Sequence, residues 1–153
     1  EIKNRINLKL YIIGRGIEKK NLEEYILQNK LEKIIKLIPF KKNPFNLIRS
    51  ADLFILSSIY EGLPNVLLEA LTLKKFVISS DCPTGPNEIL LNGKAGFLFK
   101  PQDYKKLAQL IIFYNKNQKK LSNKTNIGYK NLDRFDLKKN LEKYFQTIKK
   151  FLY

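Results

Sequence analysis

Two glutamates in Glu-x7-Glu spacing, Glu61 and Glu69, flank a predicted junction between a loop and a helix. The apolar run Leu53 to Leu56 before them has the length of a strand buried on both faces. Pro64 is favourable in a first helical turn, which predicts a helix over Pro64 to Leu73. A helix start attracts phosphate, and carboxylates accept hydrogen bonds from hydroxyls. This arrangement suits a site for a sugar nucleotide.

The two glutamates would lie at different places in that site. Glu61 would lie at the carboxyl end of the strand, whereas Glu69 would lie about one turn inside the helix. The backbone amides expected to point out of the helix start are those of Leu63, Asn65, Val66 and Leu67. The residues expected on one buried helical stripe are Val66, Leu67, Ala70 and Leu71.

At these residues the chain resembles the retaining glycosyltransferases of family 4, which have the two-domain GT-B fold and the signature Glu-x7-Glu. Further segments occur in the order that family uses, namely residues 12–16, 50–58 and 80–89. The resemblance covers roughly residues 8 to 150. It implies the C-terminal, donor-binding domain of such an enzyme, truncated at its amino terminus.

The resemblance implies transfer of a sugar, with retention, from a nucleotide diphosphate to a glycan or lipid-linked acceptor in bacterial surface polysaccharide or lipopolysaccharide synthesis. UDP is the nucleotide the family favours. Glu61 and Glu69 would be the catalytic pair: Glu69 would hold the ribose hydroxyls and Glu61 the hydroxyls of the donor sugar, and neither would be the nucleophile. The other donor sugar and phosphate contacts would be Gly14, Gly16, Gly62, Leu63, Pro64, Asn65, Val66 and Leu67. Pro39 and Phe40 would flank the nucleobase, and neither a metal nor another cofactor is expected.

Several of these residues also have structural interpretations. Phe40 is equally suited to a core position, and Ser58 is better explained as a cap at the strand end. Asp52 would hydrogen-bond locally or contact a ligand. Glu88 would be either a ligand or a first-turn residue stabilised by the helix dipole.

A dinucleotide-binding fingerprint is disfavoured, although Gly14 and Gly16 follow a predicted strand. Lys19 occupies its third glycine position, and no acidic residue ends the next strand. The chain also has no His and a single cysteine, Cys82, which we interpret as a loop residue. Metal-centred or triad chemistry and an internal disulfide are therefore disfavoured.

Strand-like and helix-like segments alternate along the chain. The predicted strands are 8–13, 34–37, 53–56, 76–79 and 96–99, and the predicted helices are 18–28, 44–49, 64–73, 86–91 and most of 103–153. This alternation predicts an α/β fold, a Rossmann-like parallel sheet with helices on both faces. We expect one nucleotide-sugar-binding domain over residues 1–153, with C-terminal helices from about residue 103.

The amino terminus departs from the family pattern. Family members open this domain with a strand that ends in Gly-Arg, followed by a Lys, and residues 1–7 leave no room for it. Lys3, Arg5 and Arg15 are not placed to replace those cations. We therefore expect weak donor affinity and no turnover by this chain alone, since the acceptor domain is absent as well.

The formal net charge is +15, and residues 100–153 hold 14 basic and 4 acidic side chains. A solvated helical face is the commonest reason for such a bias. Attraction to an anionic membrane surface is a second, and it suits an enzyme that is cytoplasmic and peripheral on the inner face of the cell membrane. Nucleic acid is not an expected partner, because no binding motif is visible. The alternative to a glycosyltransferase is a basic α/β module that binds anionic lipid or nucleic acid.

Overall fold

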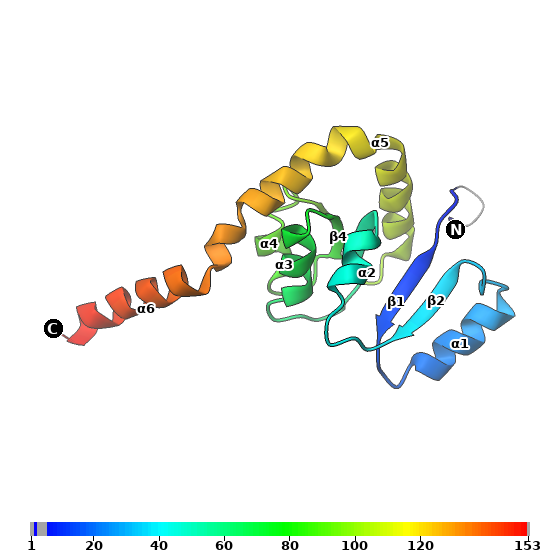
Figure 1. The fold of residues 1–153 in the computed structure, drawn as a ribbon, viewed down its shortest axis with the longest axis horizontal. Coiled ribbons are helices and arrows are strands. Elements are labelled where there is room, and N and C mark those ends of the chain that lie inside the picture. The colour runs from blue at the N-terminus through cyan, green and yellow to red at the C-terminus, as the bar shows by residue number, and fades with distance from the viewer. Residues whose placement is uncertain (1, 3–5, 153) are drawn as a thin grey trace. The chain divides into compact units, whose positions relative to one another are not determined.

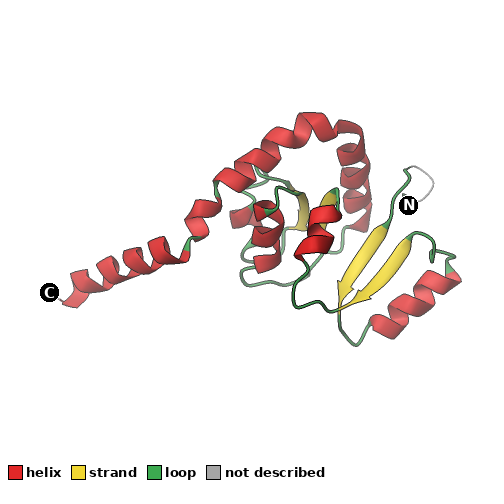
Figure 2. Cartoon of the chain, in the orientation of Figure 1, coloured by secondary structure: helices red, strands yellow, loops and turns green. Residues whose placement is uncertain are grey.

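The computed structural model describes residue 2 and residues 6–152, in which five strands and their connecting helices are followed by a helical C-terminal region (Figures 1 and 2). The chain divides into two compact units, Glu1–Leu47 and Ile48–Tyr153. Lys3 and Arg5 lie outside the described residues. The prediction of one nucleotide-sugar-binding domain over the chain stays a prediction.

The first unit contains two parallel strands, β1 (Leu10–Gly14) and β2 (Ile35–Pro39). Helix α1 (Lys19–Gln28) connects them, as the sequence predicts. In the parallel register Gly14 is the partner of Pro39. The carboxyl ends of both strands therefore meet at one edge, which carries two of the residues predicted to contact the donor.

The second unit contains a three-stranded parallel sheet with β4 at its centre. Its strands are β3 (Leu53–Leu56), β4 (Phe76–Ser80) and β5 (Phe97–Phe99). The short helix α2 (Phe45–Ser50) precedes β3, and the helices between the strands are α3 (Asn65–Thr72) and α4 (Pro86–Ile89). Each boundary lies within about two residues of the predicted one.

The centre of the second unit is β4, all of whose residues are buried. Val77 packs in a cluster with Leu67 of α3, whereas Ile78 packs in another with Leu121. Successive side chains of a strand point to opposite faces. Helices therefore cover both faces of this sheet, which confirms the predicted α/β class.

The C-terminal region is helical, as predicted. It comprises α5 (Tyr104–Lys130), a 3₁₀ turn (Leu132–Phe135) and α6 (Leu137–Leu152). Asp103 caps α5 by accepting a hydrogen bond from the Lys106 amide at 2.9 Å. The sequence does not predict the kink at Asn117 (φ −128°, ψ 17°), whose side-chain amide donates to the Phe113 carbonyl at 2.8 Å.

The strands pair in parallel throughout, but they form two sheets, β1–β2 and β3–β4–β5, where the sequence predicted one. Hydrophobic periodicity identifies a strand but does not specify its neighbours, so the division could not be read from the sequence. Within residue 2 and residues 6–152, we find no helix with the length and apolarity that crossing a membrane requires.

Candidate functional site

Glu61 lies in the loop that follows β3, at the carboxyl end of the sheet. Its Oε1 accepts a hydrogen bond from the Ser58 hydroxyl at 2.7 Å. The hydroxyl of Ser80, the last residue of β4, donates to the Ser58 carbonyl at 2.5 Å. Glu61 is thus connected to the buried central strand through two serines, which the sequence analysis did not assign to the site.

The loop after β4 also packs against the Glu61 loop. The Thr84 hydroxyl lies 2.6 Å from the Glu61 carbonyl and 2.7 Å from the Pro83 carbonyl, and either oxygen can accept its proton. Gly85 has a φ of +89°, and a Cβ there would lie 2.4 Å from Cδ of Pro64. Only glycine fits this contact without a shift, so the two loops form one structural element.

Glu69 is the fifth residue of α3, one turn inside the helix as predicted. The residue is half-buried, and its Oε2 is buried without a hydrogen-bond partner among the described residues. A buried acceptor left unpaired costs about 1–3 kcal/mol, and more if it is charged. A donor from outside the described residues would remove this cost.

The start of α3 differs in two respects from the prediction. The Leu67 amide donates to the Pro64 carbonyl at 2.9 Å, so the helix itself uses it. The amides of Asn65 and Val66, in the exposed first turn, have no intrahelical acceptor. The Val66 side chain is 36% exposed, so its predicted place on the buried stripe is wrong. It lies beside the stripe, whose buried members in α3 are Leu67, Ala70 and Leu71.

The first unit holds the remaining predicted residues, Gly14, Gly16, Pro39 and Phe40. Among the residues that the structure describes, a Cβ at Gly14 or Gly16 would meet no heavy atom within 4 Å. The Phe40 side chain is 58% exposed, which rules out the core interpretation. The Arg15 guanidinium carbon lies 5.2 Å from the centroid of the Phe40 ring, a cation–π contact that the sequence analysis missed.

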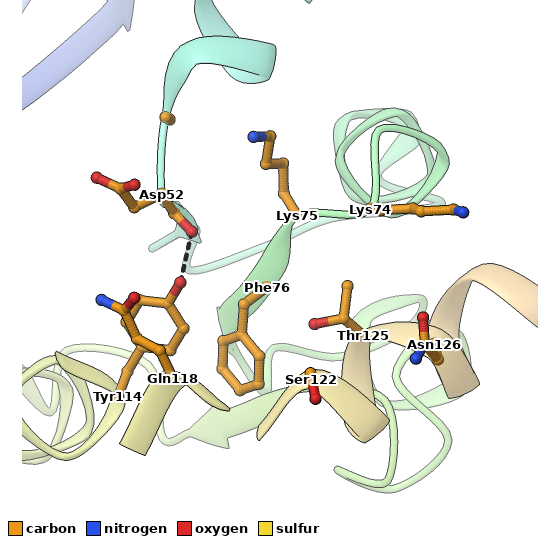
Figure 3. A pocket seen from close by; sticks show the side chains of 10 residues that line it. Asp52, Lys74, Lys75, Phe76, Tyr114, Gln118, Ser122, Thr125 and Asn126 are labelled. Carbon is orange, nitrogen blue, oxygen red and sulfur yellow. Dashed lines mark hydrogen bonds between the residues drawn. The ribbon is translucent and has the colours of Figure 1, made fainter. Parts of the chain in front are cut away.

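Asp52 lies at the other end of β3 from Glu61. It borders an open hollow of about 370 Å³ whose lining includes Lys75, Phe76 and Tyr114 (Figure 3). The Tyr114 hydroxyl donates to the Asp52 backbone carbonyl at 2.7 Å. Burial raises the pKa of Tyr114, and the nearby Asp52 carboxylate raises this pKa further. The backbone carbonyl of Asp52 therefore takes part in a tertiary contact at the opposite end of β3 from Glu61.

Glu88 and Cys82 are the other residues whose roles the sequence left open, and they lie in α4 and in the loop before it. Glu88 is exposed in the first turn of α4, and its carbonyl accepts a hydrogen bond from the Arg134 guanidinium at 3.1 Å. Cys82 is a buried free thiol in the loop between β4 and α4. In the described part of the chain, no three His, Cys, Asp or Glu residues are grouped so as to hold a metal ion.

Known proteins resemble this chain in sequence. The model of the family described as "Glycosyl transferases group 1" matches residues 1–131. An uncharacterized glycosyltransferase of Methanocaldococcus jannaschii is 40% identical over 128 residues, which cover 75% of this chain and 30% of that protein. The N-acetylgalactosamine-N,N'-diacetylbacillosaminyl-diphospho-undecaprenol 4-alpha-N-acetylgalactosaminyltransferase of Campylobacter jejuni is 27% identical over 143 residues, 92% of this chain and 39% of that protein. The chain thus spans about a third of these relatives.

Solved structures resemble it in fold. The crystal structure of Anabaena HepE in complex with UDP matches 94% of this chain and 41% of that chain, with a TM-score of 0.84 and 23% sequence identity. This likeness confirms the predicted fold, that of the C-terminal domain of GT-B glycosyltransferases.

Proposed function

The chain belongs to the family of group 1 glycosyl transferases, and from this premise we propose that it is the donor-binding domain of a retaining glycosyltransferase of family 4. The donor would be a nucleotide diphosphate sugar, with UDP as the nucleotide. Because the chain spans 30% and 39% of the two curated relatives, the activity of the whole protein is part of the proposal.

The observation that carries this proposal is the buried Oε2 of Glu69, which has no hydrogen-bond partner in the described part of the chain. A carboxylate oxygen is an acceptor only, and it pairs well with a hydroxyl donor. Ribose has two adjacent hydroxyls, so a bound nucleotide would supply the missing hydrogen bond. Glu69 would thereby fix the nucleoside.

Glu61 would contact the donor sugar. Its Oε1 accepts from Ser58, and this leaves Oε2 to accept a sugar hydroxyl. The amides of Asn65 and Val66 at the positive end of α3 would face the diphosphate, as would the backbone of Gly62, Leu63 and Pro64 through its close approach. These groups would stabilise the negative charge that develops on the departing diphosphate.

In the first unit, Gly14 and Gly16 would let the backbone approach the donor, and Pro39 and Phe40 would flank the nucleobase. The exposed ring of Phe40 supports this role, since an aromatic face stacks on a base. Uridine is supported by the UDP complex of HepE, which has the same fold.

The proposed reaction breaks the bond between the anomeric carbon and the diphosphate and forms one to an acceptor hydroxyl, with retained configuration. The hydroxyl proton and the electron pair of the broken bond both leave with the nucleotide diphosphate. The two glutamates differ in environment and in role, so they do not form the acid/base pair of a glycosidase. No metal or other cofactor is proposed.

The acceptor would be a glycan or a lipid-linked sugar in bacterial cell-surface polysaccharide or lipopolysaccharide synthesis. The name of the Campylobacter relative, which includes a diphospho-undecaprenol, supports a lipid-linked acceptor. We propose that acceptor binding requires chain beyond these residues. These residues alone would therefore not transfer the sugar, and we also propose that they bind the donor weakly.

We further propose that the parent enzyme is cytoplasmic and associates with the anionic inner face of the membrane through α6. Seven apolar or aromatic side chains of this helix lie among its lysines and are exposed: Leu137, Leu141, Tyr144, Phe145, Ile148, Phe151 and Leu152. Lysines beside an apolar helical face complement anionic headgroups, at about 1 kcal/mol per well-placed cation.

The alternative function is a basic α/β module that binds anionic lipid or nucleic acid and uses both glutamates only structurally. Amide NMR shifts of the chain, titrated at low salt with UDP, UDP-sugars, GDP and an oligonucleotide, decide between the two. Shifts selective for UDP at residues 62–67 and at Glu69 would support the donor domain. Oligonucleotide shifts confined to residues 100–152, with none from UDP, would contradict it.

A further inference from the structure

We propose that Ser58 and Ser80 are positioning residues that hold the Glu61 carboxylate in place for the donor sugar, an inference that rests on the proposed function. The sequence alone favours a capping role for Ser58. Its hydroxyl instead donates to the Glu61 carboxylate at 2.7 Å. Ser58 thereby acts on the one side chain that would contact the sugar.

The series of hydrogen bonds begins at the buried central strand of the second unit. Ser80 is fully buried at the end of the central strand β4. Its hydroxyl donates to the Ser58 carbonyl at 2.5 Å across a sequence separation of 22 residues. This bond fixes the Ser58 backbone relative to the sheet, and the Ser58 hydroxyl then fixes one carboxylate oxygen of Glu61.

Such positioning matters because the loop around Glu61 is largely exposed, including Ile59, Tyr60 and Gly62. An unrestrained glutamate loses rotamer freedom when a ligand orders it, which weakens binding. Because the Ser58 hydroxyl already holds Oε1, the Glu61 side chain loses this rotamer freedom when the chain folds and not when the ligand binds. Its Oε2 is then oriented to accept a hydroxyl. The predicted effect is on the sugar part of the donor and not on the nucleoside, which Glu69 would hold.

The chain offers a matched control for each variant. Ser58→Ala removes the bond to Glu61, Ser58→Thr keeps a hydroxyl there, and the exposed Ser57→Ala is the control for the loop. Ser80→Ala removes the bond to Ser58. Ser79→Ala is its control in β4, because Ser79 is equally buried but its hydroxyl donates to the neighbouring Ser80 carbonyl, at 3.0 Å, and not to the Glu61 loop.

The dissociation constants of UDP and of UDP-glucose, UDP-galactose and their N-acetyl derivatives would be measured for each variant by calorimetry. We expect Ser58→Ala to weaken the best UDP-sugar about tenfold relative to UDP, the size expected for a lost hydrogen bond to a charged group. Ser80→Ala should change the ratio of the UDP-sugar and UDP dissociation constants in the same direction, and Ser58→Thr should restore this ratio. The controls Ser57→Ala and Ser79→Ala should leave it unchanged.

The ¹³C chemical shift of the Glu61 carboxyl carbon reports on the hydrogen bond from Ser58 in the absence of ligand. We expect this shift to change in Ser58→Ala and to regain its original value in Ser58→Thr. If the unaltered chain binds UDP and a UDP-sugar but Ser58→Ala keeps their ratio, the positioning role is overturned and the donor site stands. If the unaltered chain binds no UDP, the proposed function is overturned, and this inference with it.

Discussion

Gly85 lies against Pro64 so closely that a Cβ on Gly85 would come within 2.4 Å of the proline Cδ and 2.5 Å of the Gly62 carbonyl. This contact joins the loop after β4 to the loop that carries Glu61. The geometry of the candidate site is therefore determined by tertiary packing between two loops as well as by its own sequence.

Gly85→Ala is expected to destabilise the fold and disturb the Glu61 loop, since both the positive φ and the contact with Pro64 oppose a Cβ. Gly93→Ala is the control, because Gly93 also has a positive φ (+81°) but its Cβ would meet nothing closer than 4.0 Å. We expect Gly93→Ala to lower the free energy of unfolding by about 1–2 kcal/mol and Gly85→Ala to lower it by at least 1 kcal/mol more. Equal losses in urea unfolding would contradict the packing argument.

Phe40→Ala is expected to weaken UDP binding about tenfold, because stacking on a base contributes about 1–3 kcal/mol. Tyr25→Ala in α1 is the matched control, since both side chains are 58% exposed. Calorimetric titration with UDP compares them. Equal affinities for UDP in the two variants would exclude Phe40 from the base site.

Tyr114 predicts a pH dependence of stability. Its pKa is raised in the folded state, so the folded chain keeps the phenol proton at a pH where the unfolded chain has lost it. The stability that the protonated Tyr114 contributes is fully present below about pH 10, and it is lost as the pH rises through the pKa of Tyr114 in the folded state. The advantage of the unaltered chain over Tyr114→Phe, about 1 kcal/mol from the bond to the Asp52 carbonyl, should shrink above pH 10.

Membrane association through α6 predicts binding to vesicles that contain anionic lipid and little binding to neutral ones. Replacing Leu141 and Phe145 by Asn should lower the partition coefficient about tenfold or more, as apolar contact area is lost. Added salt should weaken binding further, since the lysines act by screened attraction. If co-sedimentation with anionic vesicles is the same for the Asn variant and at high salt, α6 is not the segment that contacts the membrane.

The sequence predicted the elements of this fold better than their assembly. The run Leu53–Leu56 identified β3, and the glutamate pair was placed correctly on a loop and one turn into α3. The hydrogen bond from Ser80 to Ser58 could not be predicted, because it joins residues that only the pairing of β3 with β4 brings together. Exposure of Phe40 and the kink at Asn117 likewise depend on tertiary neighbours and local side-chain competition.

Binding of the nucleotide by Glu69 is tested by the UDP affinity of Glu69→Gln, measured together with the stability of that variant. We expect UDP binding to weaken at least tenfold while the free energy of unfolding stays equal or rises, because a neutral amide costs less to bury than a carboxylate whose Oε2 has no partner among the described residues. Glu142→Gln, which changes an exposed glutamate of α6, should change neither quantity. Unchanged UDP affinity in Glu69→Gln would contradict the account.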